Sequence, residues 1–118
     1  MAKVELTHNK LVRDRIPEYL NGMGITAETE VVTDQTRLLR LLLDKLEEEA
    51  KECALADVGH LLEELGDLET VVDGILKLTN RTRTELLTQQ QEKDADRGAL
   101  NNGVFLIKTT REKADESD

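Results

Sequence analysis

The stretch KLEEEAKECALADVGHLLEELGD, from Lys45 to Asp67, decides how this chain folds. It joins two segments in which apolar residues recur every three or four positions, a spacing that is typical of amphipathic helices. The first segment runs from about Gln35 to Ala54, after an N-cap at Asp34, and the second from about Val58 to Leu78. Because the link between them is short, we expect the two helices to pack antiparallel as a hairpin.

The apolar stripes of the two helices are rich in leucine and too wide for a lone hairpin to cover. They comprise Leu39, Leu42, Leu43, Leu46, Ala50 and Cys53 in the first helix, and Leu61, Leu65, Leu68, Val72, Ile75 and Leu76 in the second. A short helix around Pro17 and a fourth helix from about Thr82 to Asp96 are also expected. The pattern predicts an all-α helical bundle with short extended pieces near both ends, completed by association into a homodimer or homotetramer.

Length, charge and cysteine content narrow the class of protein. The 118 residues predict a single domain over 1–118, with a frayed polar tail over 109–118. Acidic residues outnumber basic ones by 25 to 16, which argues against binding to a nucleic-acid polymer. The single cysteine cannot form an internal disulfide. The first ten residues, MAKVELTHNK, lack the apolar run of a signal peptide, and no segment is apolar over the length that spans a membrane. We therefore expect a soluble cytoplasmic protein without membrane partners.

Two pairs of carboxylates flank the turn of the predicted hairpin. Glu49 and Glu52 are three residues apart on the first helix, and Glu64 and Asp67 have the same spacing on the second, so each pair occupies one helix face. Antiparallel packing brings both pairs to the same side of the hairpin, at matching heights along its axis. Four converging carboxylates favour a hard divalent cation, Mg²⁺ or Mn²⁺.

A simpler interpretation of the same residues is a solvated helix face. Lys45 and Lys51 can partly neutralise such a surface, and glutamate-rich faces are common without a metal. His60 lies four residues before Glu64, but one histidine is a poor basis for a zinc site. We interpret it as a polar residue near the turn.

The motifs EEAKE and ELGD resemble the EExxE and ExxD signature of the all-α nucleoside triphosphate pyrophosphohydrolases, the MazG-like group. That superfamily also includes dimeric dUTPases and phosphoribosyl-ATP pyrophosphohydrolase. Two further stretches, NKLVRDRIPEYL and EKDADRGALNNGVFL, are similar to the MazG-like subgroup. The resemblance covers Asn9 to Leu106, although RGAL stands where the family more often has RGGF, which leaves base recognition open.

The resemblance implies a reaction and a set of site residues. Water would attack the α-phosphate of a nucleoside triphosphate, releasing a monophosphate and pyrophosphate, with Mg²⁺ or Mn²⁺ as cofactor. The implied metal ligands are Glu49, Glu52, Glu64 and Asp67, with Glu48 and Glu49 as catalytic carboxylates, and Lys10, Arg13, Lys93 and Arg97 as substrate-binding residues. Removal of non-standard nucleotides is one role for such an activity.

Two alternatives stay open at this point. The substrate can be phosphoribosyl-ATP, with the same bond broken. The chain can also be a helical oligomerisation or regulatory module without turnover, although such a module has no need of four converging carboxylates.

Overall fold

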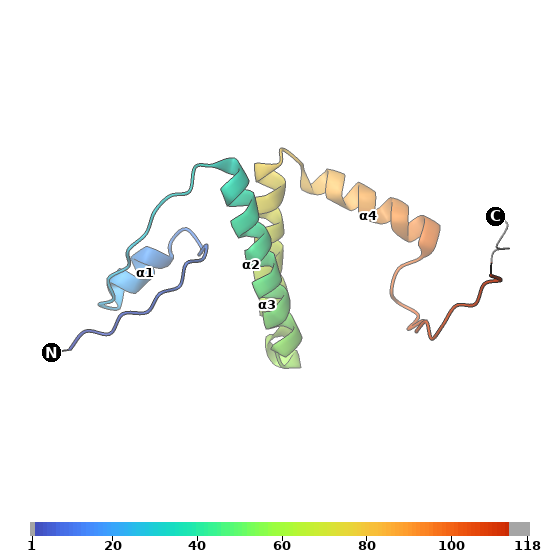
Figure 1. The fold of residues 1–118 in the computed structure, drawn as a ribbon, viewed down its shortest axis with the longest axis horizontal. Helices are drawn as coiled ribbons and strands as arrows, with labels where there is room; N and C mark the ends of the chain where they lie inside the picture. The colour runs from blue at the N-terminus through green and yellow to red at the C-terminus, as the bar shows by residue number, and fades with distance from the viewer. Residues whose placement is uncertain (1, 114–118) are drawn as a thin grey trace. The chain divides into compact units, whose positions relative to one another are not determined.

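The computed structural model describes residues 2–113, and these contain four helices and no strand (Figure 1). The helices are α1 (Ile16–Gly22), α2 (Gln35–Leu55), α3 (Val58–Leu78) and α4 (Arg83–Arg97). The all-α class is confirmed, and so are the predicted bounds of α2 and α3 to within one residue. Residues 25–34 and 104–113 have no regular secondary structure, so the extended pieces stay a prediction. The predicted frayed tail reaches residues 114–118, which lie outside the described range.

The chain divides into two compact units, one ending at Arg83 and the other beginning at Thr84. In the second unit α4 ends where Gly98 adopts a φ of 83° and donates its backbone N–H to the Asp94 carbonyl at 2.8 Å. This left-handed conformation favours glycine, as expected for a residue that stops a helix. Lys93 and Arg97 are exposed residues of this second unit.

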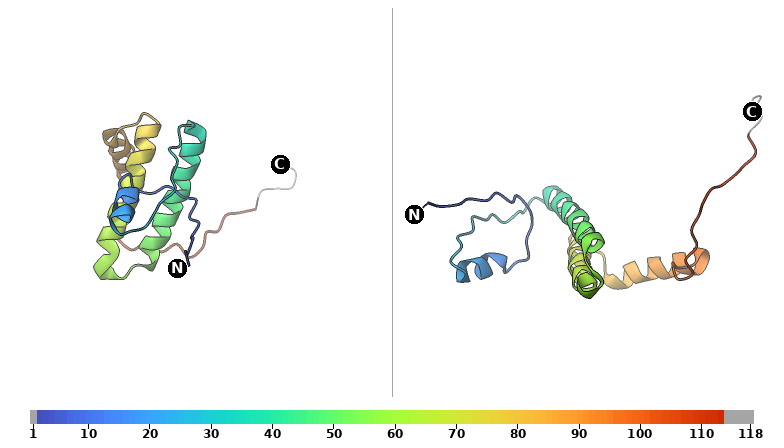
Figure 2. Two further views of the ribbon diagram at one scale, coloured as in Figure 1. Left: turned by 90° about the vertical axis from the view of Figure 1, so that its left-hand side faces the viewer. Right: turned by 90° about the horizontal axis from the view of Figure 1, so that it is seen from below.

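The first unit contains the helical hairpin of α2 and α3, whose two helices lie side by side and antiparallel (Figure 2). Aspartates cap both helices: Asp34 accepts a hydrogen bond from the Arg37 backbone N–H at 2.8 Å, and Asp57 accepts one from the His60 backbone N–H at 3.0 Å. Each cap satisfies an N–H group that the first helical turn leaves without a partner. The caps therefore set where each helix of the hairpin begins.

The packing face of α3 includes most of the predicted stripe but has a different centre. Val71, only 7% exposed, is the one buried hydrophobic residue among residues 2–113, whereas Leu65 is 40% exposed. Five of the six predicted stripe residues of α3 are among its less exposed positions, which are Leu61, Glu64, Asp67, Leu68, Val71, Val72, Gly74, Ile75, Leu76 and Leu78. The centre of this packing face is shifted from the predicted stripe towards Glu64. The apolar residues of α3 cover so wide an arc that their periodicity alone does not predict which part of the arc packs against α2. The shift brings Glu64 onto the side that meets α2.

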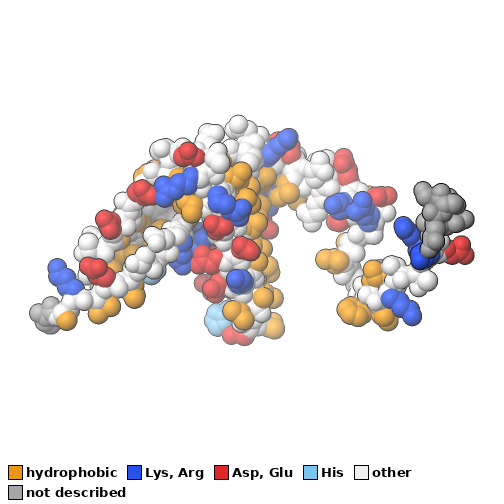
Figure 3. All heavy atoms as spheres, in the orientation of Figure 1, with side chains coloured by type: hydrophobic (Ala, Val, Ile, Leu, Met, Phe, Trp, Pro, Cys, Tyr) orange, Lys and Arg blue, Asp and Glu red, His pale blue; other side chains and the backbone are white. Residues whose placement is uncertain are grey.

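Outside this contact, the hairpin exposes much apolar surface. Leu55, Val58 and Leu62 are all more than 80% exposed near the turn. Figure 3 shows hydrophobic and acidic side chains together on the surface of the hairpin. In residues 2–113, no helix combines the length and apolar character needed to cross a membrane.

Two glycines of α3 are expected to respond in opposite ways to replacement by alanine. A Cβ at Gly66 would meet nothing within 4 Å, so Gly66→Ala is expected to raise the free energy of unfolding by about 0.5–1 kcal/mol through better helix propensity. A Cβ at Gly74 would lie 3.2 Å from the Leu42 Cδ2 atom, so that methyl group must shift. Urea unfolding should therefore show less stabilisation, or a loss, for Gly74→Ala. Equal gains in both variants would contradict the close α2–α3 contact at Gly74.

Candidate metal centre

Three carboxylates from the two packed helices converge beside their contact. Glu49 comes from α2 and Glu64 and Asp67 from α3, and one ligand oxygen from each lies within 4.8 Å of the others. Oxygens around an octahedral Mg²⁺, with bonds of about 2.1 Å, are roughly 3–4 Å apart, so small rotamer changes suffice to surround one ion. The Glu49 side chain is only 12% exposed and that of Asp67 36% exposed. The predicted convergence is confirmed for these three carboxylates.

Glu52 stands apart from this group. Its side chain is exposed, and it does not belong to the set of carboxylates that meet within 4.8 Å. Its charge nevertheless contributes to the field at Glu64. The geometry therefore assembles three of the four predicted ligands, and a ligand role for Glu52 stays a prediction.

Burial and like charges act together on Glu64. Partial burial is the larger cause that raises the pKa of its carboxyl above the ordinary value, and Asp67, Glu52 and Glu49 add to it. Burial also raises the pKa of the nearby Cys53 thiol, with further contributions from Glu64, Glu49 and Asp67. A thiol held in its protonated form is a poor nucleophile, so Cys53 is not suited to covalent catalysis.

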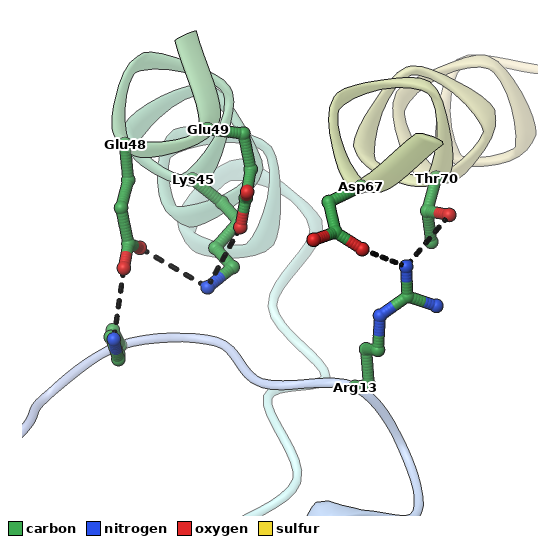
Figure 4. Close-up of polar contacts among 7 residues, drawn as sticks. Arg13, Lys45, Glu48, Glu49, Asp67 and Thr70 are labelled. Carbon is green, nitrogen blue, oxygen red and sulfur yellow. Dashed lines mark hydrogen bonds and ion pairs between the residues drawn. The ribbon is translucent and has the colours of Figure 1, made fainter. Parts of the chain in front are cut away.

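Both carboxylate oxygens of Glu48 contact lysine side chains. Lys10 Nζ lies 2.8 Å from Glu48 Oε1, and Lys45 Nζ lies 3.1 Å from Glu48 Oε2 and 3.4 Å from Glu49 Oε1 (Figure 4). The hydrogen bond from Lys10 is the main reason that the pKa of Glu48 is lowered, and the same contact raises the pKa of Lys10. Glu48 is therefore ionised and tied to two cations. As predicted for a neutralising residue, Lys45 contacts the acidic face.

Arg13 reaches the other side of the acidic cluster. Its guanidinium donates to Asp67 Oδ1 at 2.7 Å and to the Thr70 hydroxyl at 3.2 Å, while that hydroxyl donates to the Gly66 carbonyl at 3.1 Å (Figure 4). Sequence reasoning missed Thr70. The available signal was its position three residues after Asp67, which places both side chains on one face of α3.

The remaining predicted site residues are placed as follows. Lys10 and Arg13 contact carboxylates of the hairpin directly. Lys93 and Arg97 belong to the second unit, and their binding of phosphate stays a prediction. His60 Nδ1 lies 2.9 and 3.0 Å from the two carboxylate oxygens of Asp57, which confirms its interpretation as a polar residue near the turn.

Comparison with protein-family models, curated proteins and solved structures gives no match for this chain. The functional interpretation therefore depends on the geometry of the carboxylates and on the motif resemblance.

The raised pKa of Glu64 predicts a pH dependence for the metal-free protein. Such a carboxyl binds its proton more tightly in the folded than in the unfolded chain, so stability falls as the pH rises from 4.5, the ordinary value, through the raised pKa. Urea unfolding with a chelator present should show this loss as the pH rises above 4.5. Glu64→Gln should flatten the curve above this pH, and Glu47→Gln, an exposed residue of α2 whose charge is not among the causes of the Glu64 shift, should leave it in place. An unchanged slope in Glu64→Gln would contradict the assignment.

Proposed function

We propose that this protein is a Mg²⁺-dependent nucleotide pyrophosphohydrolase that cleaves a nucleoside triphosphate to the monophosphate and pyrophosphate. The observation that carries the proposal is the group formed by Glu49, Glu64 and Asp67, which lie within 4.8 Å of one another on an antiparallel helix pair. The resemblance of EEAKE and ELGD to the MazG-like signature supports the same reaction.

The chemistry follows from what the residues and the ion each supply. Mg²⁺, when bound, neutralises the triphosphate and lowers the pKa of a coordinated water. Glu49, Glu64 and Asp67 hold the ion, with Glu52 completing the predicted set. An acidic site repels an anionic triphosphate, so metal and substrate are expected to bind interdependently. Lys10 and Arg13 are proposed to contact the phosphates, and for Lys93 and Arg97 of the second unit a phosphate-binding role rests on the motif resemblance alone.

Glu48 has a narrower proposed role. Because its pKa is lowered and both its oxygens contact lysines, it is a weak proton acceptor in this arrangement. We propose that Glu48 positions Lys45 and, through it, Glu49. Proton acceptance by Glu48 requires that at least one of its two lysine contacts be released.

Product identification tests the proposed reaction. A panel of ribonucleoside and deoxyribonucleoside triphosphates, with phosphoribosyl-ATP beside them, is incubated with Mg²⁺ or Mn²⁺ in ¹⁸O-labelled water. Attack at the α-phosphate places the label in the monophosphate and leaves pyrophosphate unlabelled. Release of orthophosphate, or no turnover of any nucleotide with either metal, would contradict the proposal. The second result would favour a non-catalytic helical module.

We also propose that the chain works as a homodimer or homotetramer in the cytoplasm. The exposure of Leu55, Val58 and Leu62 supports self-association, since apolar side chains so placed gain most from a partner surface. The single thiol, Cys53, suits a reducing compartment. Sedimentation equilibrium should give two or four times the chain mass of 13.3 kDa, and a monomer would contradict the oligomer.

A further inference from the structure

A short basic segment of the first unit, residues 9–13, lies against the hairpin and is called the N-terminal strap here. Lys10 of the strap contacts Glu48 on α2, and Arg13 contacts Asp67 on α3, so the strap bridges both helices. Leu11 between them is half-buried, and it lines a small depression together with Leu41 of α2. The strap is thus held by two ion pairs, and the half-buried Leu11 lies between them.

The Arg13 contact falls on a group that the proposed function assigns to the metal. Asp67 is one of the three converging carboxylates, and its Oδ1 atom accepts a hydrogen bond from Arg13 at 2.7 Å. A divalent cation bound to Asp67 would lie a few ångströms from the guanidinium, where two positive charges repel each other. The guanidinium therefore stands in for part of the positive charge that a metal ion would bring.

The ion pair between Arg13 and Asp67 can be broken at little cost in free energy. Arg13 and Asp67 are 55% and 36% exposed, and ion pairs in such surroundings contribute little net stability because water competes for both groups. The second anchor of the guanidinium, the Thr70 hydroxyl at 3.2 Å, is neutral and also exposed. Separating Arg13 from Asp67 therefore costs little free energy compared with the free energy gained when three carboxylates bind a dication.

We propose that Arg13 is an internal counter-ion of the metal-free site, and that a divalent cation binding at Glu49, Glu64 and Asp67 displaces it. This inference rests on the proposed metal site but not on any particular substrate. It predicts that metal and Arg13 compete for Asp67, so that removing the guanidinium strengthens metal binding. An arginine that only oriented Asp67 towards the ion would have the opposite effect on affinity.

Titration with Mn²⁺ alone, following the electron paramagnetic resonance signal of the free aqua ion, measures this competition. Arg13→Gln is expected to lower the dissociation constant for Mn²⁺ by about three- to tenfold, the size expected for repulsion between a guanidinium and a dication in a screened aqueous site. Thr70→Val keeps the charge but removes one anchor, so a smaller decrease is expected. Both differences should shrink as the salt concentration rises.

Arg15→Gln is the matched control. Arg15 pairs with Glu18 of α1 at 3.4 Å, and its loss changes the net charge of the chain by the same amount. It should leave Mn²⁺ affinity within about twofold of the unsubstituted protein, because separated exposed charges are screened. Circular dichroism verifies that each variant remains helical.

The outcomes separate this inference from the proposed function. Weaker or unchanged Mn²⁺ binding in Arg13→Gln would overturn the counter-ion role while leaving the metal site intact. An equal gain in Arg15→Gln would also overturn it, since the effect would then come from net charge. If the unsubstituted protein binds no Mn²⁺, the metal site itself fails and the inference fails with it.

Discussion

Replacing Glu49 by glutamine, or Asp67 by asparagine, is expected to abolish pyrophosphate release, lowering kcat/KM by at least about 100-fold. Each substitution removes one charged oxygen ligand from the three that converge. The Glu49 side chain is only 12% exposed, less than those of Glu48 and Asp67. A neutral amide keeps nearly the same shape but binds Mg²⁺ much more weakly. The rate of pyrophosphate release at several Mg²⁺ concentrations measures the effect.

Glu47→Gln provides the control for this experiment. Glu47 is an exposed neighbour on the same helix, and its replacement changes the net charge by the same amount. Its activity should stay within about twofold of the unsubstituted protein. Near-normal activity in Glu49→Gln or Asp67→Asn would remove that residue from the ligand set, provided that circular dichroism shows the helices intact.

Metal binding is expected to stabilise the folded protein strongly. Without metal, the like charges of Glu49, Glu64 and Asp67 repel one another within 4.8 Å. A cation present at 100 times its dissociation constant adds about 2.7 kcal/mol to the free energy of unfolding, provided that it does not bind the unfolded chain. For a chain of this length, that corresponds to a rise of about 10 °C in the thermal midpoint. Thermal unfolding at fixed protein concentration, with and without Mn²⁺, measures this shift.

The Asp67→Asn variant makes this experiment specific. Its metal-free form should melt at or above the temperature of the unsubstituted protein, because one repelling charge is gone while the loss of the exposed Arg13 pair costs little. Its shift on adding Mn²⁺ should be largely lost. If Mn²⁺ raised the thermal midpoint of this variant as much as that of the unsubstituted protein, the stabilising ion would bind at a site that does not include Asp67.

Sequence periodicity and capping chemistry were sufficient to predict the central hairpin. Leucines repeat at helical spacing on both sides of the turn, and Asp34, the predicted N-cap, precedes the first helix at its observed start. The cap at Asp57 was found only in the structure. The convergence of Glu49, Glu64 and Asp67 followed from helix geometry once the pair was antiparallel. The hairpin and the convergence of its carboxylates follow from residue spacing and helix geometry, which can be worked out from the sequence.

The contacts that the sequence did not reveal are long-range or depend on packing. Lys10 and Arg13 meet their carboxylate partners across 38 and 54 residues of chain, which no local pattern encodes. The packing face of α3 is centred on Val71, because side-chain fit selects one face among several apolar ones. Glu52 is exposed on α2 and lies outside the converging group, although its charge still helps to raise the pKa of Glu64.

The most direct test of the central claim is a crystal structure of the protein soaked with Mn²⁺, using anomalous scattering to locate the ion. We expect an anomalous peak about 2.1–2.3 Å from carboxylate oxygens of Glu49, Glu64 and Asp67 together. A peak elsewhere, or a site in which these three side chains point apart and bind no ion at saturating Mn²⁺, would contradict the account.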